Sequence, residues 1–286
     1  MQTVFTFANA QSKRSVLSLT LVYLLLITAS ALTILPLLVI FIGSFKTGAE
    51  FNTTGAFDLP AVWIFDNYRT AFLRGKMALG FFNTFILIAG ACAGSILTGT
   101  MASYALHRFE FRGRAFIKNI FLWIVLIPST TAQVSRFQIV NALGLYNTRA
   151  VGIILAMGTD IMAIYIYLQF LESISRSLDE SAILDGAGYF RVYWQIVMPL
   201  LKPTTVTVLI IKSICMYNDF YTPFLYMPKQ SLQVISTALF KFKGPYGSHW
   251  EIICAGIMIA VLPTLVLFLA LQKQIYSGLV QGAVKQ

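Results

Sequence analysis

Six apolar stretches, each long enough to cross a lipid bilayer, constrain this chain more than any other feature of its sequence. About 20 mostly apolar residues span the hydrocarbon core of a membrane as a helix, whose backbone groups bond to one another. The stretches cover roughly residues 17–43, 79–105, 116–140, 151–171, 204–226 and 251–272. The sequence therefore predicts an all-α membrane protein with six transmembrane helices.

Composition agrees with that class. Of the 286 residues, 57% are hydrophobic and 11% are charged, whereas soluble domains carry about 25% charged residues. The net charge of +10 would suit nucleic acid, but the basic residues stand beside apolar stretches, where they anchor helix ends. We therefore expect no nucleic-acid partner. Cys92, Cys215 and Cys254 lie singly in apolar stretches without a CxxC motif, so we expect neither a disulfide nor a metal site.

A short basic loop after the second stretch predicts the orientation. It holds Arg108, Arg112, Arg114 and Lys118. Short loops of this kind stay on the cytoplasmic side of the membrane, and an even number of spans places both termini on that side. The expected divisions are a cytoplasmic N-terminal segment at 1–16, a six-span domain at 17–276 and a cytoplasmic tail at 277–286.

Between the fourth and fifth stretches, residues 173–203 form a charged segment that we call the elbow. By the same count of spans it lies on the cytoplasmic side. Ser177 followed by Glu180 fits an S-x-x-E capping box, which predicts a helix that starts near Leu178. Gly186 and Gly188 are unfavourable inside a helix and predict a bend between two short helices.

The elbow also carries an apolar stripe at roughly helical spacing: Ile183, Ala187, Phe190, Trp194 and Val197. Pro199 and Pro203 are expected to break the helical pattern after it. The elbow either lies on the membrane surface, with Glu180 serving only as a cap, or docks a soluble partner. Helices on membrane surfaces are usually rich in Lys and Arg. Because this one begins with Asp179, Glu180 and Asp185, the sequence favours docking.

Small residues recur at every fourth position of the second stretch: Gly90, Gly94, Thr98 and Ala102. Such a stripe lets another helix approach closely. The approaching helix belongs either to this chain or to a second membrane subunit, and the sequence leaves both alternatives open.

The elbow's pattern E-S-A-x-x-D-G, nine residues and I-V-M-P resembles the EAA loop of ABC-importer permeases, which docks into a groove of a cytoplasmic ATPase. Ser181 stands where the family usually has Ala, and Met198 where Leu precedes Pro199. Further resemblance to the carbohydrate-importer branch lies in FIGSFK (41–46), FDNYRTAF (65–72), NTFILIAG (83–90), ASYALHRFEFRGR (102–114), LGLYNT (143–148), YNDFYTPF (217–224) and SGLVQGAVKQ (277–286). The whole set is similar to the shorter, maltose-importer-type permease, except that Tyr217 replaces the usual Trp.

The resemblance implies roles for particular residues. The ATPase-docking set would be Glu180, Ser181, Ala182, Asp185, Gly186, Phe190, Trp194 and Pro199. Within it, Glu180 would be the polar anchor, and Phe190 and Trp194 the apolar ridge. A loop at Gly244, Pro245, Tyr246 and Gly247 would probe the sugar cleft of a binding protein, and the tail 278–286 would enter the ATPase interface.

Charged residues inside the fourth and fifth stretches are a second candidate site. A charge at the bilayer centre costs about 2.5–3.5 kcal/mol on insertion scales, so such residues usually face a cavity or a partner. Asp160, Lys212 and Asn218 form a structural network, or Lys212 reaches the membrane surface. Alternatively some of these residues, with Tyr217 and Asp219, line the path of the sugar, and Lys212 would then favour an acidic one.

The chain has no G-x-x-x-x-G-K-[ST] phosphate loop, so it is not expected to be an enzyme or to bind a cofactor. ATP and Mg²⁺ are expected in a partner. The resemblance implies a complex in the bacterial cytoplasmic membrane with a second permease, two ATPase subunits and an extracytoplasmic binding protein that delivers a sugar or oligosaccharide. Nucleotide-driven closure of the ATPases would move the helices through the elbow. The alternatives are an importer of a non-sugar solute, such as glycerol phosphate or a peptide, and a stand-alone secondary transporter.

Overall fold

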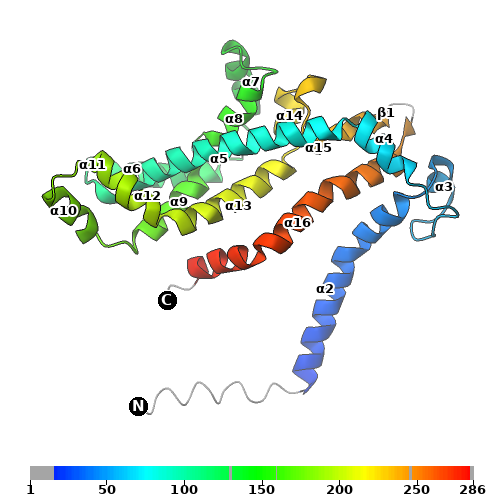
Figure 1. The fold of residues 1–286 in the computed structure, drawn as a ribbon, viewed down its shortest axis with the longest axis horizontal. Helices are drawn as coiled ribbons and strands as arrows, with labels where there is room; N and C mark the ends of the chain where they lie inside the picture. The colour runs from blue at the N-terminus through cyan, green and yellow to red at the C-terminus, as the bar shows by residue number, and fades with distance from the viewer. Residues whose placement is uncertain (1–15, 129–130, 159, 245–246, 284–286) are drawn as a thin grey trace. The chain divides into compact units, whose positions relative to one another are not determined.

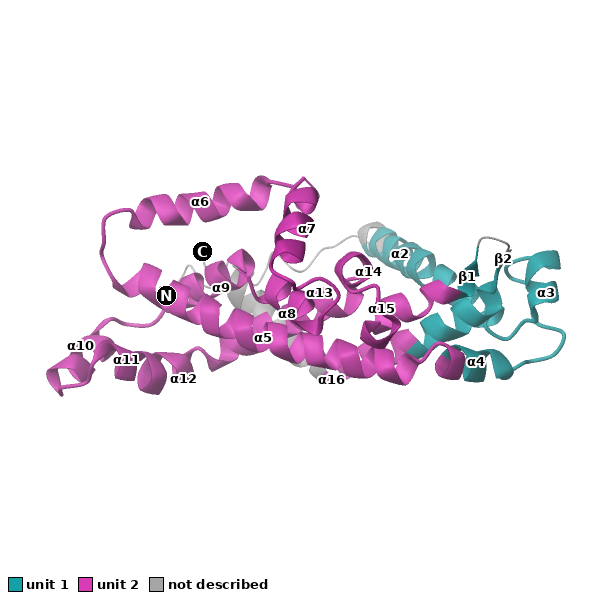
Figure 2. Ribbon diagram, turned by 90° about the horizontal axis from the view of Figure 1, so that it is seen from above, with its two compact units in different colours: residues 1–71, 242–259 teal, residues 72–241, 260–286 magenta. Residues whose placement is uncertain are grey.

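The structure is a computed structural model that describes residues 16–128, 131–158, 160–244 and 247–283 (Figure 1). The regular secondary structure of the described residues is helical apart from a short antiparallel pair of strands, β1 (Lys243–Gly244) and β2 (Gly247–Ser248). The chain divides into two compact units, residues 1–71 with 242–259 and residues 72–241 with 260–286 (Figure 2).

The helices of the first unit are α2 (Val16–Gly43), α3 (Gly48–Thr53), most of α4 (Asp66–Arg74) and the start of α16 (Trp250–Ala283). Those of the second unit begin with α5 (Met77–Arg108), α6 (Arg114–Leu126), α7 (Gln133–Ala142), α8 (Arg149–Met157) and α9 (Ile161–Leu171). The elbow follows with α10 (Ser177–Leu184), α11 (Tyr189–Val192), the π-helical turn η1 (Tyr193–Val197) and α12 (Met198–Leu200). Then come α13 (Lys202–Asn218), α14 (Tyr221–Tyr226), η2 (Gln230–Leu232), α15 (Ile235–Ala238) and η3 (Phe240–Phe242).

The all-α membrane fold is confirmed at the level of helix length and composition. Three helices are long and apolar enough to cross a membrane: Leu19–Gly43, Met77–Arg108 and Trp250–Ala270. Two bent pairs raise the number to 5 if each pair is one span, namely α8 with α9, bent by 40°, and α11–α12 with α13, bent by 72°. The described residues therefore provide three to five candidate spans.

The third, fourth and fifth apolar stretches are not continuous helices. In the third, α6 ends at Leu126, shortly before Pro128, because the residue before a proline is disfavoured in the helical conformation. In the fourth, Asp160 caps the start of α9, its Oδ1 accepting the N–H of Ala163 at 3.2 Å. In the fifth, the backbone becomes extended at Asp219, between α13 and α14.

Helix α5 is the centre of the second unit and packs against α8, α9 and α13. The stripe of small residues makes the contact with α8. A Cβ added to Gly94 would lie 2.5 Å from the Cβ of Met157, and one added to Gly90 would lie 2.8 Å from Ile153. Of the two alternatives for the stripe, the structure supports packing within this chain.

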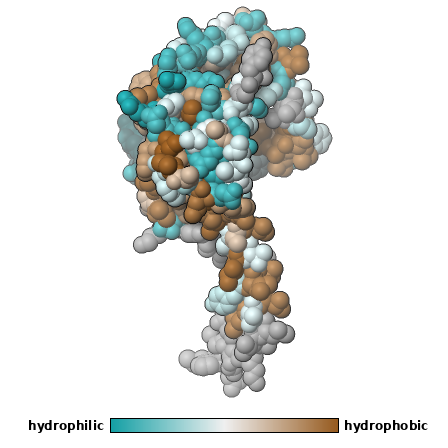
Figure 3. Space-filling view, turned by 90° about the vertical axis from the view of Figure 1, so that its right-hand side faces the viewer, coloured by the Kyte–Doolittle hydropathy of each residue, from teal (hydrophilic) through white to brown (hydrophobic). Residues whose placement is uncertain are grey.

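The first unit is organised around the FIGSFK sequence. Phe45 contacts the rings of Trp63 and Tyr68 at 4.9 and 5.2 Å. The Lys46 side chain is buried and donates hydrogen bonds to Thr54 and to the Gly55 carbonyl, both at 2.8 Å. By contrast, apolar side chains of α2 are exposed, and brown residues follow this helix in Figure 3. A helix that is apolar all round suits lipid or another membrane subunit.

Candidate functional site

The elbow has the bend that its glycine predicts. Helix α10 ends at Leu184, and Gly186 has φ of +86°, in the left-handed region that favours glycine. The N–H of Gly186 donates to the Ile183 carbonyl and the N–H of Ala187 to the Ala182 carbonyl, both at 2.9 Å. This pair of bonds is a Schellman motif, which satisfies carbonyls that the end of a helix leaves free. Asp185, directly before Gly186, is the C-cap residue.

The predicted capping box at the start of α10 is wrong. The helix begins at Ser177, whose N–H donates to the Oγ of Ser175 at 3.2 Å, and the N–H of Glu180 bonds to the backbone carbonyl of Arg176 at 3.1 Å. Because Ser175 and the Arg176 backbone serve the first turn, the Ser177 hydroxyl is not the cap. The Glu180 side chain is exposed.

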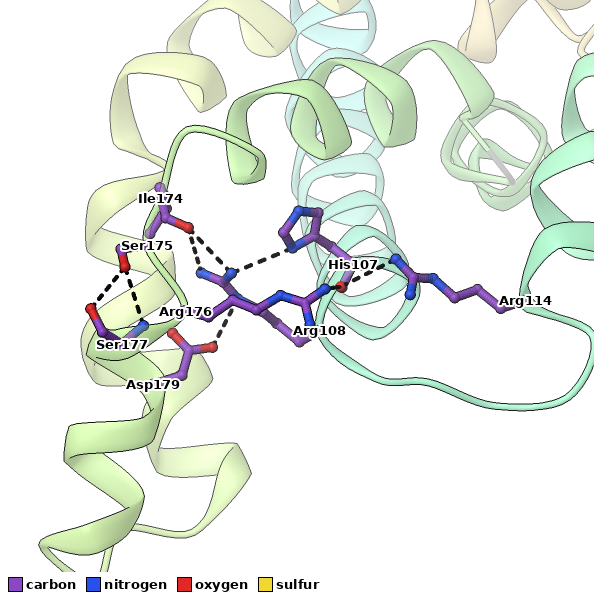
Figure 4. A network of polar contacts seen from close by, with 8 residues as sticks. All are labelled: His107, Arg108, Arg114, Ile174, Ser175, Arg176, Ser177 and Asp179. Atoms are coloured by element: carbon purple, nitrogen blue, oxygen red, sulfur yellow. Dashed lines mark hydrogen bonds and ion pairs between the residues drawn. The ribbon is translucent and has the colours of Figure 1, made fainter.

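A buried ion pair joins the elbow to α5 (Figure 4). The Nε of Arg108, the last residue of α5, lies 2.9 Å from the Oδ2 of Asp179, and the two side chains are 5% and 10% exposed. Both Nη atoms of Arg108 donate to the Ile174 carbonyl at 3.3 Å. The Oδ1 of Asp179 has no hydrogen-bond partner among the described residues. The start of α10 is therefore held to the end of α5 by charge.

Two more arginines bind the last carbonyls of α5. The Nε of Arg114 donates to the Leu106 carbonyl at 2.7 Å, and an Nη of Arg176 donates to the His107 carbonyl at 3.0 Å. The last carbonyls of a helix lack partners within it and carry partial negative charge, which cations stabilise. Arginines from three segments thus converge where the elbow meets α5, as Figure 4 shows.

Aromatic contacts form a second connection between the elbow and α5. The Tyr193 hydroxyl in η1 lies 2.7 Å from the Oγ1 of Thr100, and its ring lies 5.4 Å from that of Tyr104. Tyr193 is buried in a cluster that includes Val192 and Val197. These contacts attach the second half of the elbow to the protein.

The outward side of the elbow is apolar and acidic. Phe190 and Trp194 are exposed and touch each other, with ring centroids 6.2 Å apart. Leu184 is 88% exposed, the largest value among the exposed large apolar side chains of the described residues. Of the predicted stripe, only Val197 is fully buried, so the stripe is largely an exposed ridge.

The expected break at Pro199 is wrong. Helical backbone continues from α11 through η1 and α12, with the N–H of Met198 bonded to the Tyr193 carbonyl in π-helical fashion. Pro199 directly follows the π-helical turn, so the hydrogen bond that its missing N–H removes is accommodated by that turn and the helical backbone continues. The 72° bend comes instead at Leu201, just before Pro203 in the first turn of α13.

The charged residues of the fourth and fifth stretches surround two cavities of the second unit. The larger, about 250 Å³, is lined by Arg136, Lys212 and Asp219 together with hydroxyls and aliphatic side chains. The smaller, about 110 Å³, lies against Asp160 and Lys212. Lys212 therefore lines both cavities.

Asp160 and Lys212 form an ion pair, with Nζ 2.7 Å from Oδ2 and side chains 14% and 17% exposed. This part of the predicted network is present. Asn218 is not part of it, since its side chain donates to the Ile214 carbonyl. Tyr217 donates to the Ala260 carbonyl at 2.6 Å and lines neither cavity.

Comparisons with known proteins place the chain in a family, although no family model matches it. It is 32% identical over 266 residues to the probable starch degradation products transport system permease protein AmyC of Thermoanaerobacterium thermosulfurigenes, an alignment that covers 91% of this chain and 94% of that protein. The chain belongs to the permeases of ABC-type sugar uptake systems.

Other relatives of the permease agree. It is 30% identical to the melibiose/raffinose/stachyose import permease protein MelC of Bacillus subtilis, over 94% of this chain and 97% of that protein. Its fold matches a chain of a bacterial ABC transporter involved in the import of the acidic polysaccharide alginate, with a TM-score of 0.77 and 21% identity over 91% of this chain and 98% of that one. The permease is thus a non-catalytic, multi-pass membrane component of an import system.

Two other predicted sites of the permease are only partly described. Gly244 and Gly247 pair in the β1–β2 hairpin, while Pro245 and Tyr246 lie outside the described residues. In the tail, α16 continues to Ala283, and residues 284–286 are likewise outside the described residues. Among the described residues, no group of His, Cys, Asp and Glu side chains is arranged to hold a metal ion.

Three functional candidates of the permease are not evident from the sequence alone. Arg108 stands in a basic loop and Asp179 at the acidic start of the elbow, and residues 71 positions apart give no signal of pairing. Arg136 lies within the third apolar stretch and lines the larger cavity. Its position was itself a signal, since a charge inside a membrane stretch usually marks a site.

Proposed function

We propose that the permease forms half of a translocation pathway for an oligosaccharide, together with a second permease. An extracytoplasmic binding protein delivers the sugar, in part through the loop at 244–247, and two ATPase subunits bind on the cytoplasmic side. In this arrangement the chain crosses the membrane six times within residues 17–276, with the segments 1–16 and 277–286 in the cytoplasm. The family assignment supports the importer, and the charge of the 107–118 loop supports the orientation.

The observation that carries the proposal is the two-sided construction of the elbow. One side is fixed to α5 by the Arg108–Asp179 pair and the Tyr193 hydroxyl. The other side leaves Glu180 and the Phe190–Trp194 ridge exposed. A segment that is rigidly attached on one side and apolar on the other is suited to transmit the motion of a docked protein to the helices. The Asp185–Gly186 bend sets the angle of that surface.

The test is co-purification of the permease with its second permease, ATPase and binding protein, followed by measurement of sugar-stimulated ATP hydrolysis in proteoliposomes. Glu180→Ala should weaken retention of the ATPase while membrane insertion stays intact. Glu110→Ala removes an exposed carboxylate from the neighbouring loop and serves as the matched control. Normal assembly and transport by Glu180→Ala would remove Glu180 from the docking site, and sugar uptake without any ATPase would overturn the importer.

A further inference from the structure

We propose that the larger cavity binds an acidic sugar, with Arg136 receiving the carboxylate of a uronic acid unit and Asp219 accepting sugar hydroxyls. The inference deepens the proposed function and rests on it, because it assigns a substrate class to the same pathway. Nothing in the importer assignment itself requires a charged substrate.

The charges around this cavity are not equivalent. Lys212 is already compensated, since its Nζ binds Asp160 at 2.7 Å. Arg136 is half-buried, and its side chain makes no hydrogen bond or ion pair with any described residue. Asp219 uses Oδ1 to accept the N–H of Thr222 at 3.0 Å, which leaves Oδ2 without a described partner. One guanidinium and one carboxylate oxygen are thus open to a ligand.

Arg136 and Asp219 line the same cavity without forming an ion pair within 4.0 Å. Opposite charges in a membrane protein usually pair with one another, because each is costly alone. Two that are held apart around one cavity indicate a ligand or water that bridges them. A guanidinium binds a carboxylate through two parallel N–H bonds, and a carboxylate accepts the O–H groups of a sugar. A uronic acid unit supplies both partners.

The size and lining of the cavity set what fits. Ligand pockets usually measure roughly 300–1,000 Å³, so a cavity of about 250 Å³ holds part of an oligosaccharide rather than a chain of several units. Among the described residues, its other lining includes the hydroxyls of Thr84 and Thr222 and no aromatic ring. Recognition here therefore depends on charge and hydrogen bonds, not on stacking against a ring.

The experiment compares two substrates in the reconstituted transporter: a uronic acid oligosaccharide and the same oligosaccharide with its carboxyl groups reduced to alcohols. Uptake by Arg136→Gln is divided by wild-type uptake for each sugar. The binding protein is the same in both measurements, so its own preference cancels. Loss of a charge-assisted hydrogen bond predicts uptake of the acidic sugar about tenfold to a hundredfold lower, with the reduced sugar little changed.

Arg74→Gln, an exposed arginine at the end of α4, is the matched control and should leave both ratios near one. Arg136→Lys keeps the positive charge and should retain part of the uptake of the acidic sugar. This variant therefore distinguishes the effect of losing the charge from an effect of misfolding. An equal fall for both sugars, or wild-type transport that ignores the carboxylate, would overturn the acidic-sugar site while leaving the importer intact. Absence of ATP-dependent uptake of every sugar would overturn both.

Discussion

The ion pair between Arg108 and Asp179 permits a quantitative test of how the elbow is held. The perturbations are Asp179→Leu, Arg108→Met and the two together. Removing one member of a buried pair costs about 3–5 kcal/mol, because the other charge stays buried without compensation. After Asp179→Leu, the guanidinium would keep its two 3.3 Å contacts to the Ile174 carbonyl and a 3.5 Å contact to the Nδ1 of His107. It cannot escape the cost by losing its proton.

Two opposed effects decide the outcome. Burial raises the pKa of Asp179, and the Arg108 guanidinium opposes that rise. The pair as a whole therefore adds little net stability, and its replacement by two apolar side chains should be nearly neutral. We expect each single variant to be strongly destabilised and the double variant to recover. Two single losses of about 3 kcal/mol or more that nearly vanish together give a coupling energy of at least about 6 kcal/mol in magnitude.

The assay is amide hydrogen exchange of residues 177–185 in the assembled transporter, which reports the free energy of local opening. At about 1.4 kcal/mol per tenfold change, a cost of about 3–5 kcal/mol means that Asp179→Leu should speed exchange about a hundredfold to a few thousandfold. The double variant should lie within about tenfold of wild type. Strictly additive single variants would refute the pairing. An Asp179→Leu protein as protected as wild type would show that desolvation of the carboxylate outweighs its attraction to Arg108.

Two further substitutions test local geometry. Gly186 has φ of +86° and open space around it, so Gly186→Ala should cost about 1 kcal/mol through backbone strain alone. This cost would appear as about fivefold faster hydrogen exchange of the Ala187 amide. The control is Gly188→Ala, which should have no effect because Gly188 has φ of −74° and is equally uncrowded. Gly94→Ala, whose Cβ would lie 2.5 Å from that of Met157, should separate α5 from α8 at a cost of about 1–3 kcal/mol and lower the Tm of the purified complex; an unchanged Tm would mean that the two helices are not in close contact.

Features that depend on local sequence were predictable. The apolar stretches gave the membrane fold, and Gly186 marked the bend because few other residues adopt its conformation. The capping box failed at the same level of detail, since Ser175 competes with Ser177 for the first turn of α10. A capping motif identifies the residues that can cap a helix. The conformation of the residues before the helix then decides which of them does so.

Features that depend on distant residues were not predictable in the same way. The apolar stretch around Pro128 reads as a span because neighbouring helices can satisfy the carbonyls that a proline frees, whereas α6 ends at Leu126. The ion pair of Arg108 with Asp179 joins the ends of two helices that are far apart in sequence. The charged residues show that the end of α5 and the start of α10 are both polar. Only the contact between Arg108 at the end of α5 and Asp179 in α10 shows which carboxylate is buried.

The difference between a buried and an exposed carboxylate in the elbow matters for how a docked ATPase would move the helices. Asp179 and Glu180 are adjacent in sequence, and successive residues of a helix point about 100° apart. One side chain can therefore be buried against Arg108 while the next stays exposed. A docked ATPase that pulled only on an exposed carboxylate would bend a loosely attached helix. Because the adjacent residue is fixed to α5, the same pull would act, under the proposed function, on a helix that packs against α8, α9 and α13.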